Sequence, residues 1–268
     1  MITLMGIQKS PAACQGCRDG AALDFDISMA FQPIFDVRTG RPWAFEALVR
    51  GPQAQSAWSI LEKVSAENRY SFDQRCRVVA IERAVKAGIL DTDARLSINF
   101  LPNAVYSPKA CIQLTLRTAE IWSFPTSRLM FEFTENEKMG DTAHVRSIID
   151  SYKEMGFTIA LDDFGSGYSG LNLLSEFQTD VIKLDMELVR NIDRSMPRQM
   201  IVESMVALCK RMGIAVIAEG IETEAEYRFV RDMGIDLIQG YLLAKPGFEM
   251  LPELQWMEPQ VVPLRQAS

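Results

Sequence analysis

Carboxylate, amide and lysine side chains recur at the ends of short apolar segments along this 268-residue chain. Strands of a buried parallel sheet are expected to be apolar on both faces, so polar residues at their carboxyl ends need an explanation. A single acid there could be a structural ion-pair partner, but repetition over seven segments favours a functional site. The residues are Glu46, Asn99, Glu132, Asp162 with Asp163, Lys183 with Asp185, Glu219 and Gln239.

These side chains predict divalent metal ions. Carboxylates gathered in one place repel each other and are costly to remove from water unless cations compensate their charge. A ligand set made only of oxygen atoms favours Mg²⁺ or Mn²⁺ over Zn²⁺, and the single histidine, His144, lies in a predicted helix. The adjacent Asp162 and Asp163 could serve two metals about 3.5–4 Å apart, as in two-metal sites that cleave phosphate esters.

Two further acids, Glu135 and Glu222, each lie three residues beyond a candidate ligand. We expect them to support ligands or anchor loops rather than to bind metal. The segment Asp163-Phe-Gly-Ser-Gly-Tyr168 contains two glycines directly after the acid pair. We interpret this segment as a gating loop beside the metals, with an ordinary tight turn as the alternative.

The elements that must position these groups alternate between strand and helix. Short apolar segments predict strands at residues 29–37, 44–50, 95–100, 129–134, 157–162, 181–185, 215–219 and 237–242. Such alternation over most of the chain predicts an α/β fold, a (β/α)8 TIM-like barrel. Too few residues separate the first two strands for a crossover helix, so we expect one antiparallel strand near the start. An open doubly wound sheet is the alternative, but no Gly-x-Gly-x-x-Gly supports a dinucleotide-binding fold.

Apolar periodicity predicts helices at residues 72–89, 141–155 and 197–212. Glycines mark the ends of helices shortly before the next strand, at Gly88, Gly156, Gly213 and Gly234. The apolar faces expected for the three helices are Val78, Ile81, Ala84 and Val85; Val145, Ile148, Ile149 and Tyr152; and Ile201, Met205, Leu208 and Met212.

Composition limits the class of protein. Apolar residues make up 48% of the chain, an ordinary globular value, and about 150 residues per domain allow two small domains or one barrel. We expect an extension at 1–24, a barrel at 25–256 and a tail at 257–268. A net charge of −7 argues against a basic surface that wraps DNA, and no apolar run approaches the roughly 20 residues of a membrane span.

The cysteines and the start of the chain predict a cytoplasmic location. The five cysteines form an odd and sparse set, which indicates a reducing compartment. The first residues lack the basic flank and long apolar stretch of a secretory signal. Cys14 and Cys17 could form half of a metal or redox site, but a single such pair with no second pair favours two reduced cysteines in the extension.

Eight motifs in order resemble the EAL domain, the family of cyclic di-GMP phosphodiesterases, over about residues 27–248. They are Phe31-Gln-Pro-Ile34, Glu46-Ala-Leu-Val-Arg50, Ser97-Ile-Asn99, Glu132-Phe-Thr-Glu135, Asp162-Asp-Phe-Gly165, Lys183-Leu-Asp185, Ala218-Glu-Gly-Ile-Glu222, and Gln239-Gly-Tyr241 with Lys245-Pro246. We expect a stand-alone member, because no Gly-Gly-Asp-Glu-Phe cyclase signature is present.

The resemblance implies metal-dependent hydrolysis of cyclic di-GMP to linear 5′-pGpG. It assigns Glu46, Asn99, Glu132 and Asp162 to the first metal and Asp163 to the second. Lys183 matches a contact to the attacking water or the metal site, Glu219 a general base or second-metal ligand, and Gln239 an amide near the nucleophile. The substrate contacts would be Gln32, Leu48, Arg50 and Asp185, and the planar guanidinium of Arg50 suits a phosphate.

Departures from the family pattern are mild. Phe100 replaces the usual Val or Ser, and Gly165-Ser-Gly-Tyr-Ser-Gly170 stands where a Thr and a final Ser are common. Neither change removes a charged group, so we expect an active enzyme. The resemblance also implies a homodimer formed near the Asp-Asp-Phe-Gly loop, and a regulatory protein partner is compatible with it. The alternatives are a catalytically silent cyclic di-GMP receptor or protein-interaction module, and a phosphodiesterase for another small phosphate ester.

Overall fold

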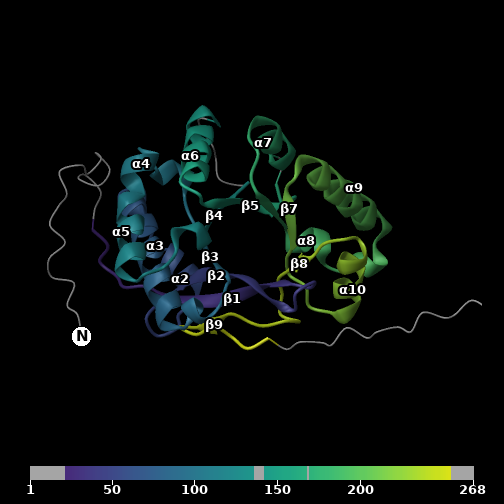
Figure 1. The fold of residues 1–268 in the computed structure, drawn as a ribbon, viewed down its shortest axis with the longest axis horizontal. Helices are drawn as coiled ribbons and strands as arrows, with labels where there is room; N and C mark the ends of the chain where they lie inside the picture. The colour runs from purple at the N-terminus through teal and green to yellow at the C-terminus, as the bar shows by residue number, and fades with distance from the viewer. Residues whose placement is uncertain (1–21, 136–141, 168, 255–268) are drawn as a thin grey trace, which may run out of the picture.

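The computed structural model describes residues 22–135, 142–167 and 169–254. A ring of strands forms the centre of the molecule, and helices lie around its outside (Figure 1). Within the described residues the strands are β1 Ser28–Asp36, β2 Arg41–Arg50, β3 Arg95–Asn99, β4 Leu129–Thr134, β5 Thr158–Phe164, β6 Val181–Leu184, β7 Ala215–Ala218, β8 Leu237–Ile238 and β9 Gly247–Phe248.

Strand pairing closes the ring. Strands β2 to β8 pair with parallel neighbours in chain order, and β1 runs antiparallel between β2 and β8. The short β9 pairs with β1 outside the ring, so the last described strand lies beside the first (Figure 1). This architecture confirms the predicted TIM-like barrel with one antiparallel strand near the start.

More helices cover the barrel than apolar periodicity predicted. The described helices are α2 Ala57–Leu61, α3 Arg69–Lys86, α4 Pro108–Cys111, α5 Gln113–Ile121, α6 Thr142–Glu154, α7 Gly170–Glu176, α8 Met186–Val189, α9 Met196–Met212 and α10 Glu224–Asp232, with short 3-10 turns between them. The glycines expected at helix ends all have positive φ angles, such as +72° at Gly213 after α9. This conformation suits glycine, which has no Cβ. No helix in the described ranges is long and apolar enough to cross a membrane.

The apolar core has two parts. The larger lies between the strands and the surrounding helices and includes Phe131, Tyr152 and Phe157. The smaller consists of Ile34, Ala44, Met130, Ala160, Val181, Ile217 and Leu237, with Trp43 against it. Its members on parallel strands precede the polar residues at the carboxyl ends, so apolar side chains fill the barrel below those ends.

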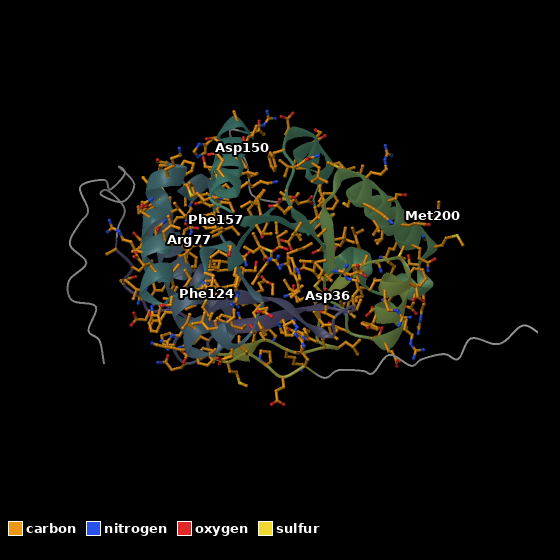
Figure 2. The ribbon with its side chains drawn as sticks, viewed as in Figure 1. Asp36, Arg77, Phe124, Asp150, Phe157 and Met200 are labelled. Carbon is orange, nitrogen blue, oxygen red and sulfur yellow. The ribbon has the colours of Figure 1, made fainter. Side chains whose placement is uncertain are left out.

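The buried faces of two helices differ from the predicted ones. In α3, Val78 and Val85 are only partly buried, whereas the side chains of Asp73 and Arg77 are buried completely. Figure 2 labels Arg77 within the molecule. The difference arose because apolar periodicity takes no account of a buried pair of opposite charges. In α9, the buried residues are Val202, Met205 and Cys209, while Ile201 is 49% exposed. The predicted face of α6 is confirmed.

Only β4 has the predicted boundaries, and the other predicted strands differ from the structure by one to four residues. Strand β8 ends at Ile238 instead of residue 242, and the backbone of Gly240 beyond it packs against the backbone of Ile221. A Cβ atom at Gly240 would lie 2.0 Å from the carbonyl oxygen of Ile221. Strand β5 continues to Phe164 and contains an irregularity that bears on the site.

Candidate metal and substrate site

Polar residues form a second layer inside the barrel, directly above the smaller apolar cluster. Side chains two residues apart on a strand point to the same face, and each polar residue lies two positions from an inward-facing one of the lower layer. The pairs along the parallel strands are Ala44 and Glu46, Ser97 and Asn99, Met130 and Glu132, Ala160 and Asp162, Val181 and Lys183, Ile217 and Glu219, and Leu237 and Gln239. On the antiparallel β1 the order is reversed, Ile34 and Gln32. Every strand of the ring therefore directs a polar residue toward the mouth.

A bulge in β5 positions two adjacent acids at this mouth. The pairing register with β6 shifts between Leu161 and Phe164, so Asp162 and Asp163 together oppose a single residue. Asp163 has a φ of +54°, a left-handed conformation that is uncommon for residues other than glycine. Neighbouring residues on a regular strand point to opposite faces, and the bulge removes that restriction. Consequently Asp162 and Asp163 both lie within one group of acids with Glu219.

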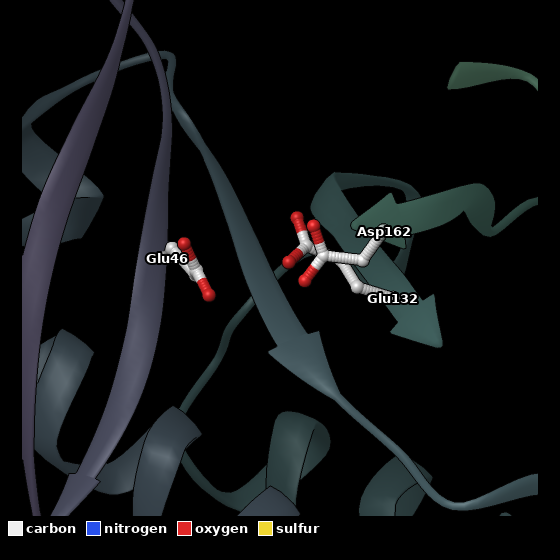
Figure 3. A group of neighbouring side chains, drawn as sticks. All are labelled: Glu46, Glu132 and Asp162. Carbon is white, nitrogen blue, oxygen red and sulfur yellow. The ribbon is translucent and has the colours of Figure 1, made fainter. Parts of the chain in front are cut away.

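Lys183 lies at the centre of the carboxylates. Its Nζ atom is 2.7 Å from Glu219 Oε1, 3.0 Å from Glu132 Oε2, 3.1 Å from Asp162 Oδ1 and 3.3 Å from Glu46 Oε2. The lysine side chain is 1% exposed. Figure 3 shows the carboxylate of Glu46 facing those of Glu132 and Asp162 across the interior of the ring. One ammonium thus contacts four carboxylates, three on strands β2, β4 and β5 and one directly after β7.

The charges of Lys183 and the carboxylates around it are unbalanced. Burial is the largest influence on Glu132 and raises its pKa to about 8, with Lys183 offsetting it only in part and Glu46 adding to it. Burial likewise raises the pKa values of Asp162 and, strongly, of Glu219. For Lys183, burial alone would lower the pKa, but the surrounding carboxylates raise it well above its ordinary value. This cluster therefore holds more acid groups than the single ammonium of Lys183 can neutralise.

Glu46 and Asp163 differ in how their charge is stabilised. Burial would raise the pKa of Glu46, but Lys183 and the side-chain amides of Gln239 and Asn99 outweigh it and lower that pKa. Gln239 Nε2 donates to Glu46 Oε2 at 2.8 Å, and Asn99 Nδ2 donates to Glu46 Oε1 at 3.0 Å. Burial and the neighbouring Asp162 raise the pKa of Asp163 to about 6.

The donor set fits divalent cations. Two groups of acids have ligand oxygens within 4.8 Å of one another: Glu46, Glu132 and Asp162, and Asp162, Asp163 and Glu219. The side-chain oxygen of Gln239 is buried and has no hydrogen-bond partner among the described residues, so it is available to a ligand. Carboxylate and amide oxygens in this number suit Mg²⁺ or Mn²⁺. The unbalanced charge provides a reason for such ions to bind.

Glu135 and Glu222 lie outside both groups. Glu135 is buried and Oε1 accepts a hydrogen bond from the backbone N–H of Gly167, so it ties the loop after β5 to the end of β4. Glu222 is exposed and pairs with Arg190 through two 2.9 Å hydrogen bonds. Both contacts are of the loop-anchoring kind. Tyr168, Cys14 and Cys17 lie outside the described residues.

The expected substrate residues are divided between several places. Leu48, Arg50 and Asn99 line a cavity of about 510 Å³ beside the mouth. Gln32 is buried and donates to the carbonyl oxygen of Ala244 at 3.3 Å. Asp185 caps α8 by accepting from Glu187 N at 2.8 Å, and it lines a different cavity of about 600 Å³. Leu48 and Arg50 thus share one cavity, whereas Asp185 lines another.

Asp73 was missed by the sequence reasoning. It lines the same cavity as Arg50, and its Oδ1 atom accepts a hydrogen bond from the backbone N–H of Leu101 at 3.0 Å. Leu101 follows Asn99 by two residues, so this bond holds the segment that carries a candidate metal ligand. The available signal was the spacing of Asp73 and Arg77, four residues apart on one helix face.

Fold and site together define a class: a (β/α)8 barrel whose catalytic-type groups gather at the carboxyl ends of its strands, with an acidic donor set for divalent metals. A family model described as the EAL domain matches residues 21–246. The chain belongs to the EAL domain family.

Three comparisons place the chain among proteins of this kind. The blue light- and temperature-regulated antirepressor BluF of Escherichia coli K12 is 32% identical over 245 residues, 90% of this chain and 60% of BluF. Cyclic di-GMP phosphodiesterase PA2567 of Pseudomonas aeruginosa is 31% identical over 231 residues, 84% of this chain and 38% of that protein. The match thus spans 38% to 60% of these relatives.

The third comparison is with a solved structure. The cyclic di-GMP-bound form of a standalone versatile EAL protein from Vibrio cholerae O395 is 50% identical, with a TM-score of 0.83. The superposition covers 87% of this chain and 97% of that one.

Proposed function

We propose that this chain hydrolyses one phosphodiester bond of cyclic di-GMP, yields linear 5′-pGpG and so lowers the level of this second messenger. The observation that carries the proposal is the ring of four carboxylates around Lys183, with the amides of Asn99 and Gln239 against Glu46. Further support comes from the relative named as a cyclic di-GMP phosphodiesterase and from the Vibrio cholerae relative that holds the dinucleotide.

Two divalent ions, Mg²⁺ or Mn²⁺, are the cofactors we assign. Glu46, Asn99, Glu132 and Asp162 would hold the first and Asp163 would help to hold the second, with Asp162 shared between the two acid groups. When bound, such ions polarise a phosphoryl oxygen and lower the pKa of a coordinated water toward neutrality. They also offset the negative charges of the carboxylates and of the dinucleotide.

We assign Glu219, Lys183 and Gln239 to the activation and orientation of the attacking water. Among the four carboxylates that contact Lys183, Glu219 has the most exposed side chain, 17% against 0–10% for the others. We therefore assign Glu219 to accept a proton from water. Lys183 and Gln239 orient that water once metal ions take over the carboxylates that the ammonium contacts, since the ammonium then has donors to spare and the Gln239 oxygen is an acceptor without a partner among the described residues. Fixing the water in line with the scissile bond is the contribution of the rigid strands.

Substrate binding is assigned to the cavity beside the mouth. The guanidinium of Arg50 donates from Nη1 to Val49 O at 2.7 Å, which leaves further N–H donors for a phosphate. Leu48 supplies an apolar wall of the same cavity. Gln32 and Asp185 stay predictions, with Gln32 inside the ring and Asp185 beside the loop that follows β5.

We further propose that the protein acts in the cytoplasm as a homodimer, with scope for a regulatory protein partner. The dimer would form next to the loop after Asp163, where Leu171 on α7 and Met186 on α8 are 59% and 42% exposed. Light scattering of the purified protein tests this part of the proposal, and a monomer at micromolar concentration would contradict it.

The test of activity is direct. Purified protein is incubated with cyclic di-GMP in Mg²⁺, in Mn²⁺ or in EDTA, and the nucleotides are resolved by chromatography. We expect pGpG in both metals and none in EDTA. Glu46→Gln should abolish the product, whereas Glu82→Gln, which removes an acid from the surface of α3, should not. Metal-independent hydrolysis, or none at all, would refute the proposal.

A non-catalytic binding role is the second candidate, favoured by the name of BluF as an antirepressor. Retained binding of intact cyclic di-GMP without product in either metal would support that role. The same chromatography, combined with calorimetry of dinucleotide binding, separates the two candidates.

A further inference from the structure

The ammonium of Lys183 contacts the same carboxylates that form the candidate metal site. Glu46, Glu132 and Asp162 make up one group of potential ligands, and each has an oxygen between 3.0 and 3.3 Å from Lys183 Nζ. Glu219, which belongs to the other group, lies 2.7 Å from the same nitrogen. Lys183 thus occupies a position that links both groups.

The buried carboxylates around Lys183 need its ammonium to compensate their charge. Glu132 is fully buried and Glu46 is 8% exposed, so solvent does little to screen their charges. Without Lys183 these carboxylates would face one another with only amide donors between them, and burying unpaired charge is strongly unfavourable. An ammonium has donors and no acceptor, so toward carboxylate oxygens it behaves as a small cation does.

We propose that Lys183 is an internal counter-ion that holds the carboxylate ring together until metal binds, and that a divalent cation must displace its ammonium from the ring. This inference rests on the metal site of the proposed function. It has an asymmetric consequence: Lys183 stabilises the metal-free protein but weakens metal binding. A lysine with a purely structural role would, when removed, lower stability and metal affinity together.

The substitution Lys183→Met tests this asymmetry because methionine is of similar length and carries no charge. In EDTA we expect Tm to fall by about 10 °C, as for other buried ion pairs that lose one partner. Titration calorimetry with Mn²⁺ alone should show a dissociation constant about tenfold lower than that of the wild-type protein, because repulsion from the ammonium is gone. Lys86→Met removes the surface pair of Lys86 with Glu82 and should change neither value.

A double variant checks that charge is the cause. Adding Glu132→Gln to Lys183→Met removes one negative charge from the ring that lost its positive charge. Tm in EDTA should then recover by at least half of its fall, while Mn²⁺ binding weakens because a candidate ligand is gone. A double variant less stable than Lys183→Met would refute the counter-ion role.

The outcomes separate this inference from the proposed function. If the wild-type protein binds Mn²⁺ but Lys183→Met binds it no more tightly, the displacement is refuted and the proposed metal site stands. If Lys183→Met proves unfolded at 25 °C, Lys183→Met with Glu132→Gln should be folded, and its failure to fold would also refute the inference. If the wild-type protein binds no Mn²⁺ and shows no metal-dependent hydrolysis, the proposed function fails and takes this inference with it.

Discussion

Removing one member of the buried pair Asp73 and Arg77 should destabilise the protein far more than removing both. The two side chains form an ion pair within α3, four residues apart, and each is fully buried. Arg77 also donates to the hydroxyl of Tyr152 at 3.2 Å and lies 5.9 Å and 5.7 Å from the ring centroids of Phe100 and Phe131. A partner left alone at this position would be a charge surrounded by aromatic rings.

The magnitude follows from burial. Burial raises the pKa of Asp73 despite the attraction of Arg77, so the carboxylate loses more by leaving water than the pairing returns. Breaking a pair of this kind by removing one partner costs about 3–5 kcal/mol, whereas replacing both by apolar residues of similar volume is often neutral. The double change also removes the hydrogen bond from Leu101 N to Asp73, worth about 1 kcal/mol. We therefore expect each single variant to lose about 3–5 kcal/mol and the double variant about 1–2 kcal/mol.

Urea denaturation followed by circular dichroism, in EDTA, measures these free energies of unfolding. The variants are Arg77→Met, Asp73→Leu and the two combined, and Arg146→Met provides a control because the pair of Arg146 with Glu176 is half exposed. The reasoning would be refuted if the double variant lost as much free energy of unfolding as the two single variants together. It would also be refuted if Arg77→Met lost less than about 1 kcal/mol relative to the wild-type protein.

Three further predictions concern the site and the helix ends. Glu46→Ala should abolish hydrolysis of cyclic di-GMP, because it removes a candidate ligand that two amides and Lys183 orient; turnover close to the wild-type rate would contradict the metal assignment. Ca²⁺ should inhibit hydrolysis in the presence of Mg²⁺, since its longer and looser coordination suits an in-line reaction poorly, and full activity with Ca²⁺ alone would oppose this. Glu226→Gln should lower the free energy of unfolding at pH 7. Burial would raise the pKa of Glu226, but the backbone N–H groups of Asn191, Glu222 and Thr223 outweigh it and lower that pKa. Its stabilisation is therefore complete above the unfolded pKa of about 4.3 and is lost as pH falls below it, so the difference between variant and wild-type protein should shrink below pH 4.

The barrel and its polar layer were predictable because both follow from alternation along short strands. A strand such as residues 129–134 places Met130 and Glu132 on one face, and the same order of apolar then polar residue repeats on most of the parallel strands. The repetition of this order over several strands, rather than any single acid, predicted that polar side chains gather at the mouth of the barrel. The short link between the first two strands likewise indicated the antiparallel β1, because a crossover helix could not fit.

Helix faces were less predictable because exposed and buried residues can be equally apolar. On α9, Met196, Met200 and Ile201 are 49–70% exposed, and Met200 projects from the outer side of the molecule (Figure 2). The buried Val202, Met205 and Cys209 lie on the neighbouring face of the same helix. On α3 the opposite difficulty arose, since the buried face contains two charges. Periodicity detects hydrophobicity and gives no sign of a charged pair that compensates itself within the core.

The adjacency of Asp162 and Asp163 shows where alternation fails and why that matters for the site. A regular strand would turn Asp163 away from the mouth, and the ring would then contain a single complete acid group, Glu46, Glu132 and Asp162. The bulge opposite Lys183 and the left-handed backbone of Asp163 bring in the second group. Both features depend on pairing with β6, which the residues of β5 alone do not specify. The second acid group therefore arises from an irregularity of the fold, in addition to the regular pattern that predicted the first group.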